Sequence, residues 1–173
     1  MYEDVVHVPL IMCWPGVTEP GAVCNAMVTH ALDLATTLSE AAGLPVPDTY
    51  QGRSLLPLLR GETPPDWPTE VLSTYNGAQF GLYVQRMLRD HRFKYVWNPT
   101  DVDELYDLER DPWELENLVG QPDHHECLAT MRTRLLALLT EQRDDIVAKP
   151  WLRQQLGHDA DYFDHGVNCN SYV

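Results

Sequence analysis

Two short runs of alternating apolar residues, separated by turn-forming residues, constrain the fold of this chain more than any other feature. The runs are Phe93–Trp97 and Glu104–Leu108, and Asn98-Pro99-Thr100-Asp101 lies between them. Alternation with a period of two places apolar side chains on one face of a strand, so the pattern predicts a β-hairpin with a loop longer than two residues. The apolar face of such a hairpin requires a second layer to pack against.

The residues after the hairpin predict how it ends and what covers it. Asp111-Pro112 should stop the second strand, because proline has no N–H for the ladder, and Trp113–Leu118 can form one helical turn. A long helix is predicted over Asp123–Val147, with a capping box of Asp123 at the N-cap and Glu126 three residues later. One apolar stripe would pack it on the sheet; its members are Leu128, Met131, Leu135, either Leu138 or Leu139, and Ile146.

Two further strands are predicted before the hairpin, at Thr69–Tyr75 and Gly81–Leu88. With the hairpin they make an antiparallel sheet of about four strands, which is a usual size. Glu62–Pro68 contains three prolines and is interpreted as a linker.

The chain before the linker has a different pattern. Val5–Trp14 is almost continuously apolar, which is typical of a strand buried on both faces of a parallel sheet. Cys24–Val28 could form another short strand. A helix is predicted over His30–Ala42, with Thr29 as the N-cap and Gly43 just past its end.

Composition excludes several classes of function. Twelve Lys and Arg residues against 26 Asp and Glu residues give a net charge of −14, which argues against binding to nucleic acid.

Val8–Trp14, the longest apolar run, is far shorter than the ~20 residues that cross a bilayer. The acidic start at Met1–Asp4 is unlike a signal peptide, so the chain as given is expected to be cytoplasmic. No C-x-x-C pair is present, and free thiols are expected at Cys13, Cys24, Cys127 and Cys169.

Several motifs together resemble the sulfatase family. The hairpin region matches its C-terminal signature at Phe93, Lys94, Tyr95, Asn98, Glu104 to Leu108, Asp111, Pro112, Glu114, Asn117 and Leu118. Earlier matches are Tyr2-Glu3, Val8-Pro9-Leu10-Ile11, Trp14-Pro15-Gly16, Pro20-Gly21, His30, Asp33-Leu34, Thr37-Leu38, Ala42-Gly43 and residues 52–59. His7 and Thr36 depart from the pattern, standing where Arg and Pro are common.

The resemblance implies that residues 2–146 correspond to about the last third of a sulfatase. The fold class expected is then α+β: a remnant strand and helix of a large α/β layer, followed by the four-stranded antiparallel sheet and its long helix. The corresponding domains are 1–61 for the remnant, 62–68 for the linker, 69–149 for the sheet and helix, and 150–173 for a polar tail. Apolar surface left wet costs about 25 cal/mol per Å², so the Val8–Trp14 segment should be rearranged, mobile or buried against a partner.

Sulfatases hydrolyse sulfate esters with a formylglycine made from the first residue of a Cys/Ser-x-Pro-x-Arg motif, and with a calcium or magnesium ion. None of the four cysteines begins such a motif, and neither does Ser54. We therefore expect no catalytic residue, no metal ligand and no cofactor in this chain. We also expect no sulfatase activity from it alone, because the reaction needs an activated nucleophile and concentrated positive charge.

Few side chains remain as site candidates. His30, at a helix N-terminus beside a strand end, could face the rim of an active site or be an ordinary capping-region histidine. His158, Asp161, Asp164 and His165 could bind a metal adventitiously or belong to a solvated acidic tail. The run His124 to Cys127 is interpreted as capping and solvated. Lys94 and Arg86 are interpreted as solvated strand residues rather than substrate clamps.

Three functional hypotheses follow. The first is the C-terminal portion of a sulfatase-like hydrolase, with the sulfated, phosphate or phosphonate ester left open. The second is a non-catalytic binding or assembly module, whose partner is the missing catalytic portion of a split hydrolase or a second copy of the chain. The third is a small metal-binding protein that uses the tail residues.

Overall fold

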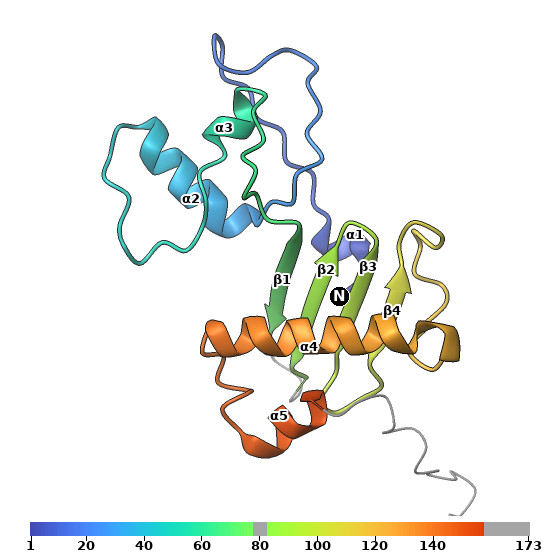
Figure 1. Ribbon diagram of the computed structural model, residues 1–173. Helices are drawn as coiled ribbons and strands as arrows, with labels where there is room; N and C mark the ends of the chain where they lie inside the picture. Colours follow the sequence, from blue (N-terminus) through green and yellow to red (C-terminus); the bar gives the residue numbers. More distant parts are fainter. Residues whose placement is uncertain (78–82, 158–173) are drawn as a thin grey trace, which may run out of the picture. The chain divides into compact units, whose positions relative to one another are not determined.

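The computed structural model describes residues 1–77 and 83–157, and the side chain of His30 lies outside this description. The chain forms two compact units (Figure 1). One unit contains residues 1–6 together with the chain from Leu72 onward, and the other is His7–Val71.

A four-stranded sheet forms the first unit's centre. Its strands are β1 (Glu70–Tyr75), β2 (Gln85–Asp90), β3 (Phe93–Trp97) and β4 (Glu104–Asp107), in the order β1-β2-β3-β4. The β2–β3 and β3–β4 pairs are antiparallel, with Tyr95 opposite both Leu88 and Leu105. The predicted hairpin and four-stranded sheet are confirmed.

Helices cover one face of this sheet. The short 3-10 helix η1 (Pro122–His124) leads into α4 (His125–Glu141), which runs across the strands, and α5 (Pro150–Gly157) packs beside α4 (Figure 1). The predicted stripe is confirmed at Leu128, Met131, Leu135 and Leu139, which is buried where Leu138 is only half-buried. The predicted end at Val147 is wrong: α4 ends at Glu141, and Ile146 joins the core from the turns that follow the helix. The core between the layers contains Leu88, Tyr95, Trp97, Leu105, Leu128, Met131, Leu135, Leu139, Ile146, Val147, Leu152 and Leu156.

Two local predictions in this unit are wrong. Asp123 does not cap α4: the helix has its N-cap at His124 without a side-chain bond, because η1 occupies the preceding turn. Trp113–Leu118 forms no helical turn, because Glu114 has a left-handed φ of 56°. The segment instead returns to the sheet, where the Leu118 N–H donates to the Leu105 carbonyl at 2.8 Å.

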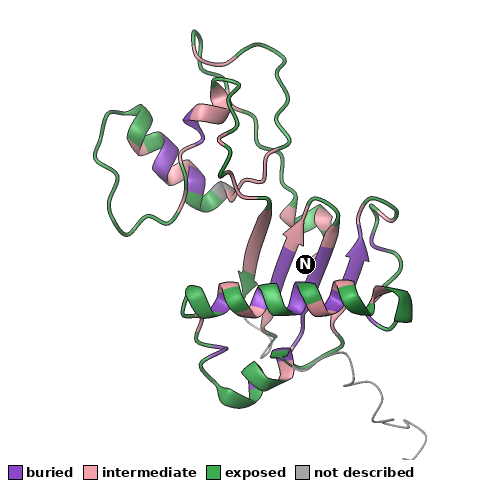
Figure 2. Cartoon of the chain, viewed as in Figure 1, coloured by how far each residue is buried: buried purple, intermediate pink, exposed green. Residues whose placement is uncertain are grey.

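The unit His7–Val71 contains α2 (His30–Ala41) and α3 (Leu56–Leu59), while α1 (Glu3–Val6) belongs to the first unit. The helix prediction is confirmed, but the strands predicted at Val5–Trp14 and Cys24–Val28 are wrong. A strand requires a neighbour to accept its backbone hydrogen bonds, and the described part of the chain offers these segments none. Ile11 is 91% exposed, and green predominates outside α2 and α3 in this unit (Figure 2). No described helix is long and apolar enough to cross a membrane.

Candidate functional site

A row of polar side chains crosses three strands on the face of the sheet opposite α4. Arg89 on β2 pairs with Lys94 on β3, and Lys94 pairs with Tyr106 on β4. Their sequence neighbours Leu88, Tyr95 and Leu105 belong to the core under α4. Because side chains alternate along a strand, the row Arg89–Lys94–Tyr106 faces the other way.

The first residues of the chain bind to this row. The Glu3 carboxylate accepts hydrogen bonds from Arg89 Nε at 3.1 Å and from Lys94 Nζ at 3.4 Å. Lys94 Nζ also donates to the Met1 carbonyl at 2.9 Å and forms an ion pair with Glu114. The Glu3 N–H donates to Glu114 Oε2 at 2.6 Å. We call Glu3, Arg89, Lys94 and Glu114 the Lys94 cluster.

Lys94 is fully buried, with 0% of its surface exposed, so its predicted role as a solvated strand residue is wrong. The same prediction is wrong for Arg86, which is buried and donates to the Asp144 carboxylate through Nε at 2.8 Å. Burying a charge costs several kcal/mol unless it is paired, and both cations have carboxylate partners. Those partners come from distant parts of the sequence.

Electrostatics favour the ionised form of Glu3. Burial raises the pKa of its carboxyl, but the hydrogen bond and charge of Arg89, together with Lys94, outweigh burial and bring the pKa below its usual value. The pKa of the Tyr106 hydroxyl moves in the opposite direction: burial and the neighbouring Glu104 carboxylate raise it, which favours the neutral form. The Tyr2 ring lies 6.3 Å from the Tyr106 ring, which extends the contact beyond the charged groups.

A second buried network joins the hairpin loop to α4. The Tyr95 hydroxyl donates to Asp103 Oδ2 at 2.6 Å and accepts from Arg132 Nε at 3.1 Å. Burial raises the pKa of Tyr95 well above its usual value and also raises the pKa of Asp103. Tyr95 therefore stays protonated near neutral pH, and the network suits packing rather than nucleophilic attack.

In the unit His7–Val71, polar groups of α2 hold the loop at residues 52–55. Asp33 accepts from the backbone N–H of Thr29 at 2.6 Å and of Arg53 at 2.8 Å. The Thr37 hydroxyl accepts from the Leu55 N–H at 2.8 Å. Thr36, which departs from the sulfatase pattern, donates to the Gly52 carbonyl at 3.0 Å. This arrangement positions the loop at residues 52–55 against α2.

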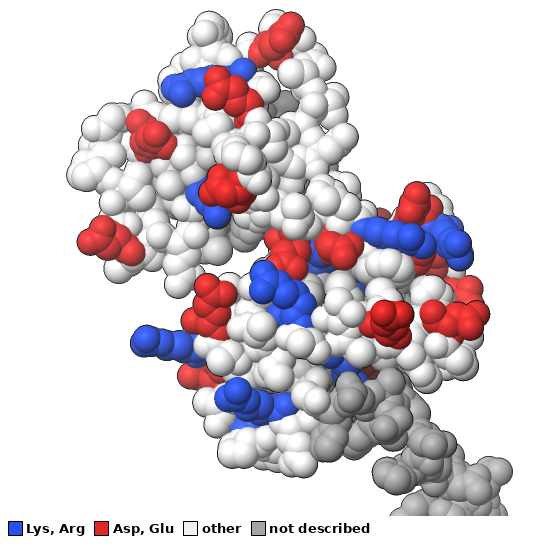
Figure 3. Space-filling view, viewed as in Figure 1, with Lys and Arg blue, Asp and Glu red and all other residues white. Residues whose placement is uncertain are grey.

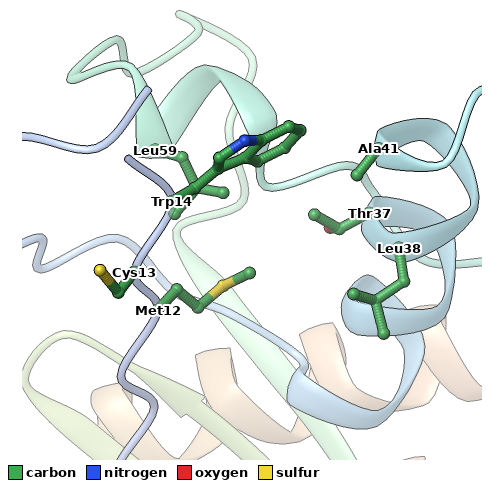
Figure 4. Close-up of a pocket in the computed structure, with 7 residues that line it drawn as sticks. All are labelled: Met12, Cys13, Trp14, Thr37, Leu38, Ala41 and Leu59. Carbon is green, nitrogen blue, oxygen red and sulfur yellow. The ribbon is translucent and has the colours of Figure 1, made fainter. Parts of the chain in front are cut away.

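A pocket of about 300 Å³ lies in the same unit (Figure 4). The Trp14 ring extends across it from one side, and the α2 side chains lie opposite. Its lining is Met12, Cys13, Trp14, Thr37, Leu38, Ala41 and Leu59. The hydroxyl of Thr37 already bonds to the backbone of Asp33 and Leu55, so the lining is suited to apolar groups.

The site residues predicted from the sequence fall at the edge of the described part of the chain or beyond it. His30 begins α2, with its side chain outside the description. His158, Asp161, Asp164 and His165 lie outside the described residues. Among residues 1–77 and 83–157, no group of three His, Cys, Asp or Glu side chains could hold a metal ion. The described residues therefore do not fit the calcium or magnesium that the resemblance implies, and we derive no step through it.

Charged side chains show no concentrated basic area on the face drawn in Figure 3, where Lys and Arg are interspersed with Asp and Glu.

The sequence analysis did not predict the Lys94 cluster, although Tyr2-Glu3, Lys94 and Glu114 each belong to a motif that matches the sulfatase pattern. The available signal was a lysine between the apolar residues Phe93 and Tyr95, with the sulfatase motifs supplying its two carboxylates.

Comparison with known proteins identifies a family for this chain. The family model for the C-terminal part of N-sulphoglucosamine sulphohydrolase matches residues 1–141. Delta 4,5-hexuronate-2-O-sulfatase of Bacteroides thetaiotaomicron is 33% identical over 147 residues, which cover 83% of this chain and 31% of that protein. Human arylsulfatase K is 34% identical over 131 residues, covering 68% of this chain and 23% of that protein.

Solved structures agree with the sequence comparison. Phosphonate monoester hydrolase from Silicibacter pomeroyi has a TM-score of 0.65 and 30% identity, over 73% of this chain and 28% of that one. A putative sulfatase from Bacteroides thetaiotaomicron has a TM-score of 0.61 and 33% identity, over 70% of this chain and 28% of that one. The chain therefore spans about a quarter to a third of the length of these relatives.

Proposed function

This chain belongs to the sulfatase family, and from that premise we propose that it is the C-terminal supporting part of a sulfuric ester hydrolase. The observation that carries the proposal is the family match over residues 1–141, together with relatives of which the chain covers 31% or less. In this role the sheet and α4 provide packing, and the ester is attacked by groups on other polypeptide.

We propose further that these 173 residues alone do not hydrolyse sulfate esters. Support comes from the sequence, where no cysteine begins a Cys-x-Pro-x-Arg motif and Ser54 is followed by Leu-Leu-Pro-Leu. Hydrolysis of a sulfate ester requires an activated nucleophile and positive charge near the departing anion. The cations described above are already paired: Lys94 with carboxylates in a buried cluster, and Arg86 with Asp144.

The test is an assay of the purified chain on an aryl sulfate with added calcium or magnesium, beside a full-length sulfatase as positive control. Turnover indistinguishable from buffer is expected. A phosphonate monoester should be assayed in parallel, because one similar structure is a phosphonate monoester hydrolase. Turnover of either ester, proportional to the concentration of this chain, would overturn the proposal.

A second candidate function is a binding or assembly module, which includes one half of a split hydrolase. The observation that favours it is the exposed apolar surface of the unit His7–Val71, since large exposed apolar patches mark interaction sites. The exposed residues are Val8, Leu10, Ile11, Trp14, Val23, Leu32, Leu38, Leu44, Val46 and Tyr50. The partner is a catalytic polypeptide or a second copy of the chain.

Sedimentation velocity over a range of concentrations tests the second copy as partner. If this surface mediates self-association, the wild-type chain should form larger species as its concentration rises, and Ile11→Gln should weaken that association. Because the Ile11 side chain is exposed, this substitution should leave the fold unchanged. A monomer at every concentration would exclude the second copy and leave the catalytic polypeptide as partner.

A further inference from the structure

Contacts that are very distant in sequence hold the segment Met1–Glu3 on the sheet. Its partners Arg89, Lys94 and Glu114 lie 86 to 111 residues away along the chain. The intervening unit His7–Val71 is compact by itself. Residues 1–3 therefore relate to the sheet as a peptide relates to the protein that binds it.

The contacts define which peptide fits. Arg89 donates to Glu3 through Nε at 3.1 Å and through its terminal nitrogen at 3.1 Å, which is two-point recognition of a carboxylate. Lys94 Nζ donates to the backbone carbonyl of Met1. The Tyr106 ring lies beside the ring of Tyr2. The chemistry selected is an acidic residue directly preceded by an aromatic one.

Charge and burial show that the site is built on the sheet side. Arg89 and Lys94 carry two positive charges and Glu114 carries one negative charge, so these three side chains together carry +1. The Glu104 carboxylate accepts from the Tyr106 hydroxyl at 3.1 Å and is a further negative charge beside the site. Glu3 supplies the complementary charge of −1. Lys94 and the Glu114 carboxylate are buried and form an ion pair with each other, which keeps both groups oriented toward the peptide.

The main chain of Glu114 contributes as well. Its left-handed φ of 56° is uncommon for a residue with a Cβ and costs of order 1 kcal/mol or more. This conformation accompanies a carboxylate that accepts the Glu3 N–H at 2.6 Å. Strain of this kind persists where surrounding contacts over-determine it, and it clusters at sites that bind.

We propose that Arg89, Lys94, Tyr106 and Glu114 form a peptide-binding site specific for an aromatic–glutamate segment, whose resident ligand is the chain's own Tyr2-Glu3. The site uses side chains and backbone groups that any peptide containing Tyr-Glu carries. It therefore holds the segment without needing the covalent connection through residues 7–71. This function is independent of ester hydrolysis, so failure of the proposed hydrolase role leaves it standing.

The experiment uses the full chain with its resident ligand disabled by Tyr2→Ala and Glu3→Ala. The probe is a fluorescein-labelled peptide, Met-Tyr-Glu-Asp-Val-Val, with an amidated C-terminus, and binding is measured by fluorescence anisotropy. The double variant should bind the probe at least tenfold more tightly than the wild-type chain, in which residues 1–3 compete at high effective concentration. Equal affinity for the two proteins, or no binding to the double variant, would overturn the proposal.

Specificity supplies the second measurement. A probe with Gln in place of Glu should bind the double variant at least tenfold more weakly, because Arg89 and Lys94 lose the carboxylate. Adding Arg89→Gln to the double variant should cause a similar loss, whereas Arg53→Gln, which removes an exposed pair with Asp66, should cause none. Equal binding of the Glu and Gln probes would overturn the assignment, as would equal losses from the two arginine variants. Circular dichroism of every variant confirms that it is folded.

Discussion

Gly52 is a position where one hydrogen in place of a methyl group decides local structure. A Cβ added there would overlap the backbone carbonyl of Leu32 and lie 2.6 Å from the backbone nitrogen of Asp33. Neither atom can move without displacing α2. The loop at residues 52–55 therefore approaches the helix closely enough for the bonds to Asp33, Thr36 and Thr37 only because residue 52 has no side chain.

The first prediction concerns this close approach. Gly52→Ala should lower the free energy of unfolding by about 1–3 kcal/mol, the usual cost of forcing extra atoms into a packed place. Gly120→Ala is the matched control, because a Cβ there meets nothing within 4 Å. Urea denaturation monitored by circular dichroism measures both. A Gly52→Ala protein as stable as the control would contradict the described contact.

The second prediction concerns acid. The pKa of Glu3 is lowered in the folded chain, so its contribution to stability is fully present above the ordinary glutamate pKa of about 4.3 and is lost as pH falls through the lowered value. The difference in urea midpoint between wild type and Glu3→Gln should therefore be largest at pH 7 and shrink in acid. A constant difference would contradict the lowered pKa.

Asp103 provides the comparison with opposite sign. Burial raises the pKa of Asp103 in the folded chain, although Tyr95, Asn98 and Arg132 bond to it and lower the pKa in part. Folding therefore favours the protonated form of Asp103. Its contribution to the free energy of unfolding is present below the ordinary aspartate pKa and is lost as pH rises through the raised pKa. In Asp103→Asn, the pH dependence of unfolding should change in the direction opposite to that of Glu3→Gln.

At the scale of elements, α5 is a short amphipathic helix that the sequence did not predict. Residues 150–157 were assigned to a polar tail, but they form a helix whose Leu152 and Leu156 complete the core beside α4. Two apolar residues four apart give too weak a periodic signal to predict a helix. The two leucines are buried because α5 packs against α4, and this contact is visible only in the folded chain.

The third prediction tests this packing. Leu156→Ala should destabilise the first unit by about 2–5 kcal/mol, the usual range for a buried leucine, because Leu156 is 1% exposed. Trp151→Ala on the same helix is the control: Trp151 is 62% exposed and its loss should change stability by about 0.5 kcal/mol or less. Urea denaturation followed by near-ultraviolet circular dichroism distinguishes them. Equal effects would show that α5 does not dock as described.

At the scale of the whole molecule, the two units differ in what stabilises them. The first contains the large core under α4 and α5. The unit His7–Val71 buries Leu55 and Leu56 among its large apolar residues and relies on the polar bonds between α2 and the loop at residues 52–55. A unit with few buried apolar contacts opens locally at low free energy.

The fourth prediction follows from that difference. Amide hydrogens at residues 8–13 should exchange within seconds, because this segment has no strand or helix and its apolar side chains are largely exposed. Amides of β2 and β3 should be protected for hours under the same conditions. Hydrogen exchange with mass spectrometry measures both segments in one experiment. Protection at residues 8–13 in the purified chain would contradict the exposed segment described here and would indicate that a second copy covers it.

The sequence by itself determined the elements whose signals are local. The alternating runs predicted β3 and β4, the stripe from Leu128 to Leu139 predicted α4, and the motifs around them predicted the family. Such patterns depend on residues within a few positions of each other, where periodicity and turn chemistry are strong.

Only the tertiary structure decided which charged side chains are buried in ion pairs and which apolar segments form strands. Lys94 was interpreted as solvated because a lysine alone belongs in water, yet Glu3 and Glu114 reach it from opposite directions along the chain. Val8–Trp14 has the composition of a buried strand but forms none, because a strand exists only where another backbone accepts its hydrogen bonds. Pairing of this kind depends on groups that only the folded chain brings together.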